Sequence, residues 1–124
     1  MNVTARTMLS AALCAVMLLA GCQRGAQSLS LDEQQAREAC RSALGAWKEG
    51  KKPGDLTPGI VVGDETWDAG KKLIDFELLP GERSDGTNLH LPVKLTLQDE
   101  KGKESKTEVL YIVGTSPVVT VFRR

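Results

Sequence analysis

The stretch that decides the fold of this 124-residue sequence is Leu89-His90-Leu91-Pro92-Val93-Lys94-Leu95-Thr96-Leu97. Every second residue in it is apolar, and a strict period of two is typical of a β-strand with one buried face. Residues 107–113 repeat the alternation after the turn at residues 99–103, so the two runs are predicted to pair as a hairpin. Leu110 and Ile112 make the second run apolar on both faces, which indicates a central strand.

Shorter apolar runs on either side of this hairpin predict further strands. Residues 72–79 alternate, with Ile74 the first side chain on the inner face, and residues 118–122 return as a last strand. The brief apolar run within residues 59–63 is flanked by glycines and favours a short edge strand. Residues 80–88 are rich in glycine and charge, which predicts a loop. About four antiparallel strands are therefore expected.

A single long helix is predicted before these strands. Ser30 is placed as its N-cap, with Glu33 three residues later in capping-box position. Gly50 is placed to end it, and Pro53 prevents its continuation. Its apolar face recurs at spacings of four, three and four and consists of Ala36, Cys40, Ala43 and Trp47.

The expected fold class is α+β. A sheet with one apolar face needs a cover, and the helix is the only long amphipathic element available for it. We expect one domain over residues 30–124, with one N-terminal helix packed on a curved antiparallel sheet of about four strands. This order of elements, from Ser30 to Phe122, resembles the cystatin-like and NTF2-like folds, in which a helix packs in the concavity of a curved antiparallel sheet. The resemblance rests on element order and not on a sequence motif.

The resemblance to NTF2-like proteins implies a possible site between helix and sheet. Enzymes of that fold place an acid or base there, and Asp64, Asp68 or Asp75 are the candidates in this sequence. The alternation of residues 72–79 instead puts Asp75 on the solvated side of its strand. The side chains expected to line such a pocket, or to fill the core instead, are Trp47, Trp67 and Tyr111.

The first residues have the three parts of an export signal. Arg6 supplies positive charge, and residues 8–20 form an apolar run of 13 residues interrupted only by Ser10. That run is shorter than the roughly 20 residues that a membrane-spanning helix needs. It ends in Leu19-Ala20-Gly21-Cys22, which resembles the lipobox of bacterial lipoproteins. The alternative is an ordinary secretory signal with an incidental cysteine.

The lipoprotein resemblance implies a lipid anchor at Cys22. In that family the cysteine thiol takes a diacylglycerol, the bond between Gly21 and Cys22 is cut, and the new amino terminus is acylated with a chain such as palmitate. Residues 1–21 are then a signal peptide and residues 22–29 a flexible tether. The anchor places the domain in the cell envelope, and Gln23, where an aspartate would retain the protein at the inner membrane, favours the outer membrane.

Charge and composition exclude several classes of partner and cofactor. Residues 22–124 carry 15 of the 16 basic and all 16 acidic residues, so their net charge is −1 and predicts no nucleic-acid partner. His90 is the only histidine, which argues against a zinc site. Cys40 is the one cysteine outside the signal and the lipobox, and it is predicted to be a buried apolar residue. We expect no metal, no cofactor and no catalytic residues.

The outer face of the predicted sheet is the remaining candidate for function. Leu110, Ile112 and Val118, with Pro92 nearby, are predicted to form a partly apolar patch there. Such a patch is either an interface, for an envelope protein or for a second copy of the chain, or a set of scattered surface aliphatics. The expected function is that of a lipid-anchored envelope protein with a small non-enzymatic binding or structural domain. The alternative is an NTF2-like small-ligand binder or acid–base enzyme with a pocket between helix and sheet.

Overall fold

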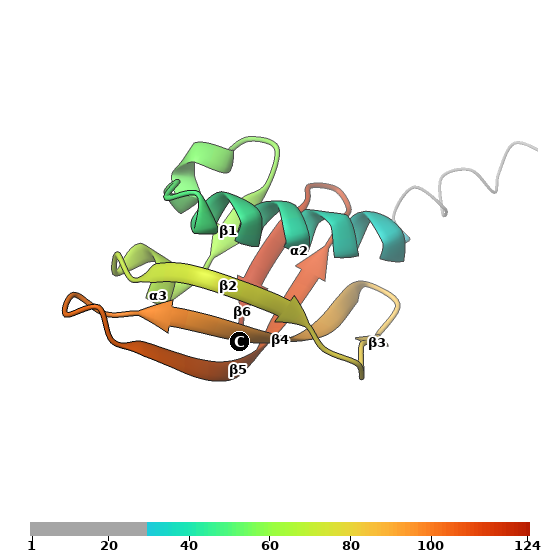
Figure 1. The fold of residues 1–124 in the computed structure, drawn as a ribbon. Helices are drawn as coiled ribbons and strands as arrows, with labels where there is room; N and C mark the ends of the chain where they lie inside the picture. Colours follow the sequence, from blue (N-terminus) through green and yellow to red (C-terminus); the bar gives the residue numbers. More distant parts are fainter. Residues whose placement is uncertain (1–29) are drawn as a thin grey trace, which may run out of the picture.

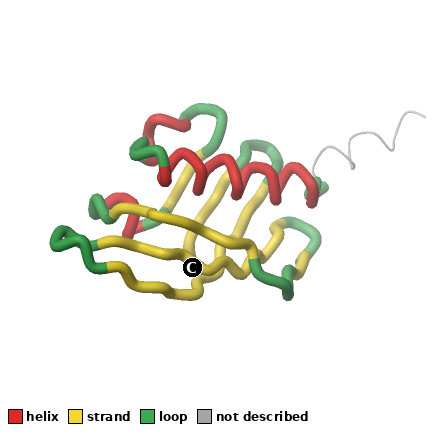
Figure 2. The backbone as a smooth tube through the Cα atoms, in the orientation of Figure 1, coloured by secondary structure: helices red, strands yellow, loops and turns green. Residues whose placement is uncertain are grey.

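The computed structural model describes residues 30–124, which form an α+β domain with one main helix on a curved sheet (Figure 1). The signal peptide predicted at residues 1–21 and the tether at residues 22–29, with Cys22, lie outside the described residues. Helix α2 spans Glu33–Lys48 and lies across one face of the sheet (Figure 2). Two short helices follow it: η1 (Pro53–Leu56) lies between α2 and the first strand, and α3 (Glu65–Asp68) lies between the first and second strands.

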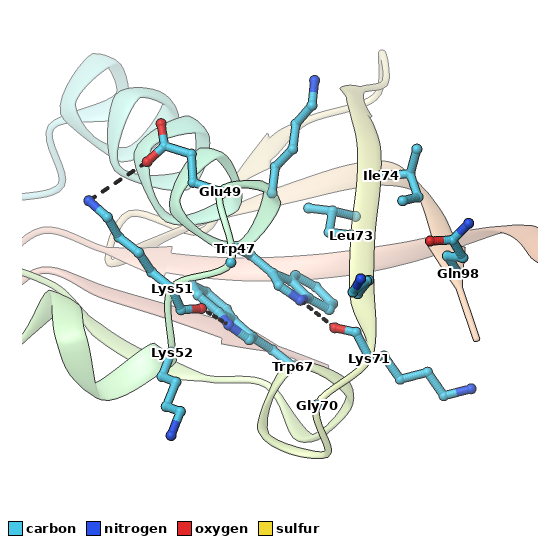
Figure 3. A pocket seen from close by; sticks show the side chains of 13 residues that line it. Trp47, Glu49, Lys51, Lys52, Trp67, Gly70, Lys71, Leu73, Ile74 and Gln98 are labelled. Carbon is cyan, nitrogen blue, oxygen red and sulfur yellow. Dashed lines mark hydrogen bonds and ion pairs between the residues drawn. The ribbon is translucent and has the colours of Figure 1, made fainter. Parts of the chain in front are cut away.

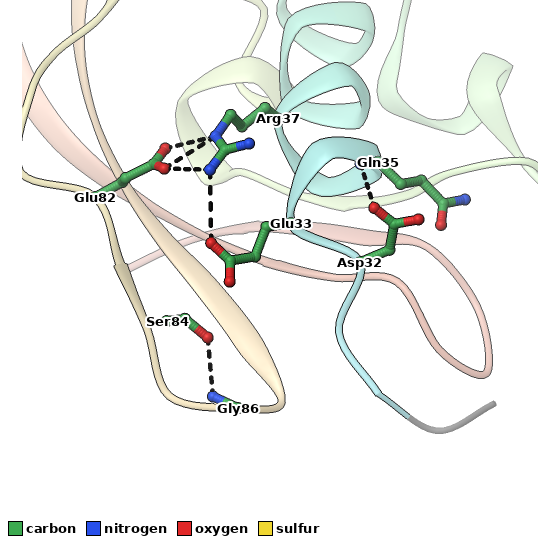
Figure 4. A network of polar contacts seen from close by, with 7 residues as sticks. All are labelled: Asp32, Glu33, Gln35, Arg37, Glu82, Ser84 and Gly86. Atoms are coloured by element: carbon green, nitrogen blue, oxygen red, sulfur yellow. Dashed lines mark hydrogen bonds and ion pairs between the residues drawn. The ribbon is translucent and has the colours of Figure 1, made fainter. Parts of the chain in front are cut away.

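The start of α2 differs from the prediction. Its N-cap is Asp32, whose carboxylate accepts a hydrogen bond from the Gln35 backbone N–H at 3.0 Å (Figure 4). The predicted N-cap, Ser30, therefore lies two residues before the observed N-cap. The Asp32 backbone N–H also donates to the Thr115 hydroxyl at 3.0 Å, and this contact with the turn before the last strand is one that local sequence does not indicate. The predicted end is confirmed, because Gly50 follows the helix with a left-handed φ of 90°.

The sheet has more strands than the sequence predicted, and it is mixed. Its order is β1-β6-β5-β4-β2, with β3 paired to β4. The expectation of about four antiparallel strands is matched only roughly: residues 30–124 form six strands, and β1 runs parallel to β6. The pairing joins residues about sixty positions apart, Val61 with Thr120, which hydrophobic periodicity cannot reveal. The strands are β1 (Val61–Gly63), β2 (Lys72–Leu78), β3 (Arg83–Ser84), β4 (Asn88–Gln98), β5 (Glu104–Gly114) and β6 (Thr120–Arg123).

The predicted central hairpin is confirmed. Strands β4 and β5 pair antiparallel along their whole length, with Leu91 opposite Tyr111 and Val93 opposite Val109. Strand β5 also pairs with β6 and is central, as its two apolar faces predicted. Strand β4 contributes one side of the hydrophobic core, since its odd-numbered residues from Leu89 to Leu97 are all buried.

Strand β2 departs from the predicted alternation at one position. Leu73 pairs with Leu97 and Asp75 pairs with Thr96, so the register shifts at Ile74. A β-bulge inserts one extra residue and resets which side chains point inward. Leu73, only 3% exposed, therefore takes the core position that the sequence assigned to Ile74.

Small side chains bring α2 close to the sheet. Ala36, Cys40 and Ala43 are fully buried and belong to the same apolar cluster as the inner residues of β4 and β5. Cys40 is therefore a buried apolar residue, as predicted, and its burial raises the pKa of its thiol to about 12. A thiol with this pKa stays protonated and unreactive at neutral pH.

An ion pair fixes the outer side of α2 to the loop after β2. The Arg37 guanidinium donates two hydrogen bonds of 2.9 Å from Nε to the Glu82 carboxylate, and it also lies 3.5 Å from Glu33 (Figure 4). Hydrogen bonding to Arg37 lowers the pKa of the Glu82 carboxyl. This surface ion pair adds a contact between the helix and the loop to the packing of the buried apolar face.

Candidate functional site

A buried carboxylate connects the three aromatic residues singled out from the sequence. Asp64 follows β1 directly and is the N-cap of α3, where its Oδ1 accepts hydrogen bonds from the backbone N–H groups of Thr66 (3.0 Å) and Trp67 (3.2 Å). Its Oδ2 accepts the Tyr111 hydroxyl at 2.5 Å. The Arg123 guanidinium approaches Oδ1 at 3.4 Å from β6. We call this arrangement the Asp64 cluster.

The Asp64 cluster has the geometry of a structural contact. The Asp64 side chain is 0% exposed, and both of its oxygens are occupied by donors from the protein. Burial, followed by the hydrogen bond to Asp64, raises the pKa of the Tyr111 hydroxyl well above its ordinary value of 10. Tyr111 therefore keeps its proton, and the carboxylate has no oxygen directed at a substrate. This arrangement favours a role in joining β1, α3, β5 and β6.

The other two proposed acid–base residues are exposed, unlike Asp64. Asp68 is exposed on α3. Asp75 is exposed on β2, as its alternation predicted, and pairs with Lys48 at 3.5 Å. Asp68 thus lies one helical turn after Asp64, with its backbone N–H donating to the Asp64 carbonyl at 2.9 Å, while Asp75 lies on a different element.

Two indole rings continue the connection from Asp64 to the end of α2. Trp47 and Trp67 stack with ring centroids 5.2 Å apart and an interplanar angle of 6° (Figure 3). The Trp47 Nε1–H donates to the Lys71 carbonyl and the Trp67 Nε1–H to the Lys51 carbonyl, both at 2.7 Å. The rings are 3% and 4% exposed, so they fill the core, one of the two roles that the sequence allowed.

His90 lies on the face of the sheet opposite α2, as its alternation predicted. Its Nε2 is 2.9 Å from the Asp85 carboxylate, while Nδ1 is buried without a hydrogen-bond partner among residues 30–124. Backbone N–H groups of Asn88 and Thr87, together with His90, lower the pKa of Asp85 to about 2. The pair closes the turn between β3 and β4. Among the described residues, no group of three or more potential ligands is arranged to hold a metal ion.

The outer face of the sheet carries apolar side chains on β1, β6, β5 and β4. The strand register places Gly63, Phe122, Ile112 and His90 in one row across it, with Leu110 and Pro92 paired in the neighbouring row. Phe122 is 44% exposed, and Val61, on the same face, is 36% exposed. We call this surface the apolar strip, and it consists of Val61, Pro92, Leu110, Ile112 and Phe122.

The predicted outer patch is therefore shared in part with the apolar strip. Leu110, Ile112 and Pro92 belong to both, while Val118 lies in the turn before β6 and is 52% exposed. Phe122 was missed as an outer residue, although alternation around the inward Val121 indicates its direction. Its ring lies against Gly63, where a Cβ atom would be 2.9 Å from Phe122 Cδ1. The short edge strand thus needs a glycine at this position for the ring to pack.

The other half of the outer face is charged. Glu77, Lys94 and Glu108 are paired in one row across β2, β4 and β5, and Lys94 lies 3.5 Å from Glu77. These charges alternate in sign along the row, and Lys94 and Glu77 form an ion pair. The apolar strip is consequently a localised surface with a charged border on one side.

Comparisons with protein-family models, with curated proteins and with solved structures found no match to this chain. Within residues 30–124, no helix combines the length and the apolar character required to cross a bilayer. The interpretation of function therefore rests on the residues and geometry described above.

The role of Asp64 as a connecting residue predicts a large loss of stability on its removal. Asp64→Ala leaves the Tyr111 hydroxyl, the Arg123 guanidinium and two backbone N–H groups without their acceptor, and we expect it to lower the free energy of unfolding by about 3–5 kcal/mol. Asp68→Ala is the matched control, since it removes an exposed carboxylate from the same short helix and should change stability by less than about 0.5 kcal/mol. Urea denaturation followed by tryptophan fluorescence measures both. Equal effects of the two variants would contradict the assignment.

The raised pKa of Tyr111 predicts a specific alkaline behaviour. Tyr111 is the only tyrosine, so the absorbance of tyrosinate reports on it alone. An unfolded tyrosine ionises near pH 10, and a higher pKa in the folded state means that stability from this group is complete below pH 10 and is lost as the pH rises above it. We expect tyrosinate to appear only together with alkaline unfolding, monitored by circular dichroism. Ionisation near pH 10 with an intact far-ultraviolet spectrum would refute the buried hydrogen bond to Asp64.

Proposed function

We propose that this protein is a lipid-anchored component of the cell envelope whose domain binds another protein through the apolar strip. The observation that carries the proposal is the exposure of Phe122, at the centre of an apolar surface, in a domain whose core is otherwise closely packed. Apolar surface that remains in water after folding is characteristic of interfaces. The domain acts by binding and not by catalysis.

The properties of the apolar strip suit a protein partner. The exposed aromatic ring of Phe122, paired across the sheet with Ile112, provides the large apolar area typical of an interface centre. Beside Phe122, a shallow hollow of about 690 Å³ is bordered by charges of both signs: Glu65 and Asp68 from α3, and Arg123 and Arg124 from the end of the chain. A polar border next to an apolar centre is the usual anatomy of a protein interface.

The lipid anchor supports the same function by restricting where the domain meets its partner. Cys22 in the lipobox is the proposed site of attachment, and residues 22–29 join it to Ser30 at the start of the described domain. An eight-residue tether reaches at most about 27 Å when extended. The domain is therefore held close to the bilayer, for which Gln23 favours the outer membrane.

The alternative of an NTF2-like ligand binder or acid–base enzyme has less support. It requires a pocket between the helix and the sheet, where Ala36, Cys40 and Leu44 of α2 are fully buried within the apolar cluster. It also requires an available acid or base, while the buried carboxylate of Asp64 is fully hydrogen-bonded. The likeness of this chain to cystatin-like and NTF2-like proteins is a likeness in the order of the helix and the strands.

Lipidation at Cys22 is tested by mass spectrometry of the protein from its native membranes. We expect a chain that begins at residue 22 and carries a diacylglycerol and an amide-linked acyl group. Cys22→Ser should abolish incorporation of a labelled fatty acid and release the protein from the membrane fraction. Cys40→Ser is the control and should leave both unchanged, since Cys40 is buried in the core. An unmodified Cys22 in the native product would refute the anchor.

Binding through the apolar strip is tested by crosslinked pull-down from envelopes, with the mass of the native complex measured in parallel. Phe122→Ser should reduce recovery of the partner about tenfold or more, as expected for an aromatic residue at an interface centre. Val61→Lys places a charge on the same strip and provides a second variant should the first fail to fold. Val118→Ser, at a more exposed apolar residue that lies in the turn and outside the strip, is the matched control.

The outcomes of this experiment separate the two possible occupants. A different protein at fixed stoichiometry identifies an envelope partner, and a complex of twice the monomer mass identifies a second copy of the chain. If the variants keep the thermal midpoint of the original chain and all recover the partner equally well, the strip is not the binding surface.

A further inference from the structure

A second surface, at the C-terminal end of α2, has a different chemistry. A hollow of about 530 Å³ lies over the stacked indoles of Trp47 and Trp67 (Figure 3). We call it the lysine hollow because five lysines line it, from two segments about twenty residues apart: Lys48, Lys51, Lys52, Lys71 and Lys72. It lies at the opposite end of α2 from Ser30, where the described domain begins (Figure 1).

The positive charge of the lysine hollow is concentrated and only partly neutralised. The chain as a whole has equal numbers of basic and acidic residues, 16 of each, yet Glu49 is the single carboxylate lining this hollow. Glu49 pairs with Lys51 at 3.7 Å, and Lys48 pairs with Asp75 outside the hollow at 3.5 Å. The remaining three form no ion pair within the described part of the chain; they are Lys52, Lys71 and Lys72.

The aromatic core holds the two lysine segments in place. The Trp47 indole donates to the Lys71 carbonyl, and the Trp67 indole donates to the Lys51 carbonyl. Because the rings stack on each other, these two hydrogen bonds fix the backbones of both segments relative to one another. The lysine side chains then extend from a rigid base, which reduces the entropy lost when a ligand binds.

The hollow continues toward the hairpin between β4 and β5. A neighbouring hollow of about 420 Å³ shares Lys71, Lys72 and Gln98 with it and adds Lys101. Asp99 and Glu100 also line this extension, and the Asp99 Oδ1 accepts hydrogen bonds from the backbone N–H groups of Lys101 and Lys103. The combined surface is therefore elongated and carries six lysines against three carboxylates, with the excess positive charge concentrated in the lysine hollow.

From this surface we infer that the lysine hollow is a binding site for an anionic glycan, a sugar polymer with repeating carboxylate or phosphate groups. Lysine ammonium groups bind such anions as mobile point charges, without the fixed fork of arginine. The indole faces are stacked on each other and nearly fully buried, so they offer no platform on which bases of a single-stranded nucleic acid would stack. A concave, elongated surface also fits a polymer chain better than a flat bilayer. This site is separate from the apolar strip and goes beyond the proposed protein-binding function.

The two tryptophans provide a direct measurement. They are the only tryptophans in the sequence, and both border the hollow, so their fluorescence reports binding there. The full chain in neutral detergent is titrated with polygalacturonate, which carries carboxylates, and with phosphomannan, which carries phosphodiesters. We expect a saturable fluorescence change with at least one of them that weakens as salt rises, and none with neutral dextran.

Matched substitutions locate the binding. Lys71→Gln with Lys72→Gln removes two unpaired charges and should weaken binding about tenfold or more. The hydrogen bond from the Trp47 indole survives in this variant, because its acceptor is the backbone carbonyl of Lys71 and not the lysine side chain. Lys94→Gln with Lys106→Gln removes the same net charge from the outer sheet face and should leave the affinity within about twofold. Both variants should keep the thermal midpoint of the original chain.

Several results would overturn the inference. These are no binding of either polymer, or an equal loss of affinity in the two double variants, which indicates general attraction to charge. Tighter binding of single-stranded DNA than of both glycans would assign the hollow to nucleic acid. A fluorescence change only with micelles containing phosphatidylglycerol would assign it to anionic lipid. None of these outcomes depends on lipidation at Cys22, which is measured separately.

Discussion

One buried carboxylate accepts four hydrogen bonds and thereby holds different parts of this domain together. Asp64 sits where β1 ends and α3 begins, and it also receives donors from β5 and β6 through Tyr111 and Arg123. A charge removed from water is tolerated in a protein only when its acceptor capacity is used in this way. The short parallel strand, which has only three residues of pairing, is thus fixed to the sheet at its end as well as along its edge.

Both proposed binding surfaces follow from this contact. On one side it aligns β1 with β6, so that Phe122 packs over Gly63 and the apolar strip extends to the edge of the sheet. On the other side it sets the first turn of α3, which places Trp67 against Trp47 and holds the backbones under the lysine hollow. The apolar strip and the lysine hollow therefore share a rigid connection while differing in chemistry, as the two proposed binding functions require.

The predictions that succeeded depend on local pattern. The alternation of residues 89–97 is sufficient to identify the central hairpin, because side chains in a strand point to opposite faces in turn. The helix was likewise identified from a local period, that of apolar residues three and four positions apart. Its position over the sheet follows from the need to cover one apolar face. The prediction at Ile74 was wrong because a bulge adds one residue to β2, and nothing in the local composition distinguishes Leu73 from Ile74 as the inward residue.

What the amino-acid sequence determined by itself is the α+β class, the long helix and the central hairpin, since each depends on residues close together in the chain. Only the tertiary structure decided that β1 is parallel to β6, that Asp64 is buried against Tyr111, and that lysines from two separate segments surround one hollow. These arrangements join residues between about twenty and sixty positions apart. Their energies come from burial and hydrogen bonding between distant segments, and such terms leave no periodic signal in the sequence.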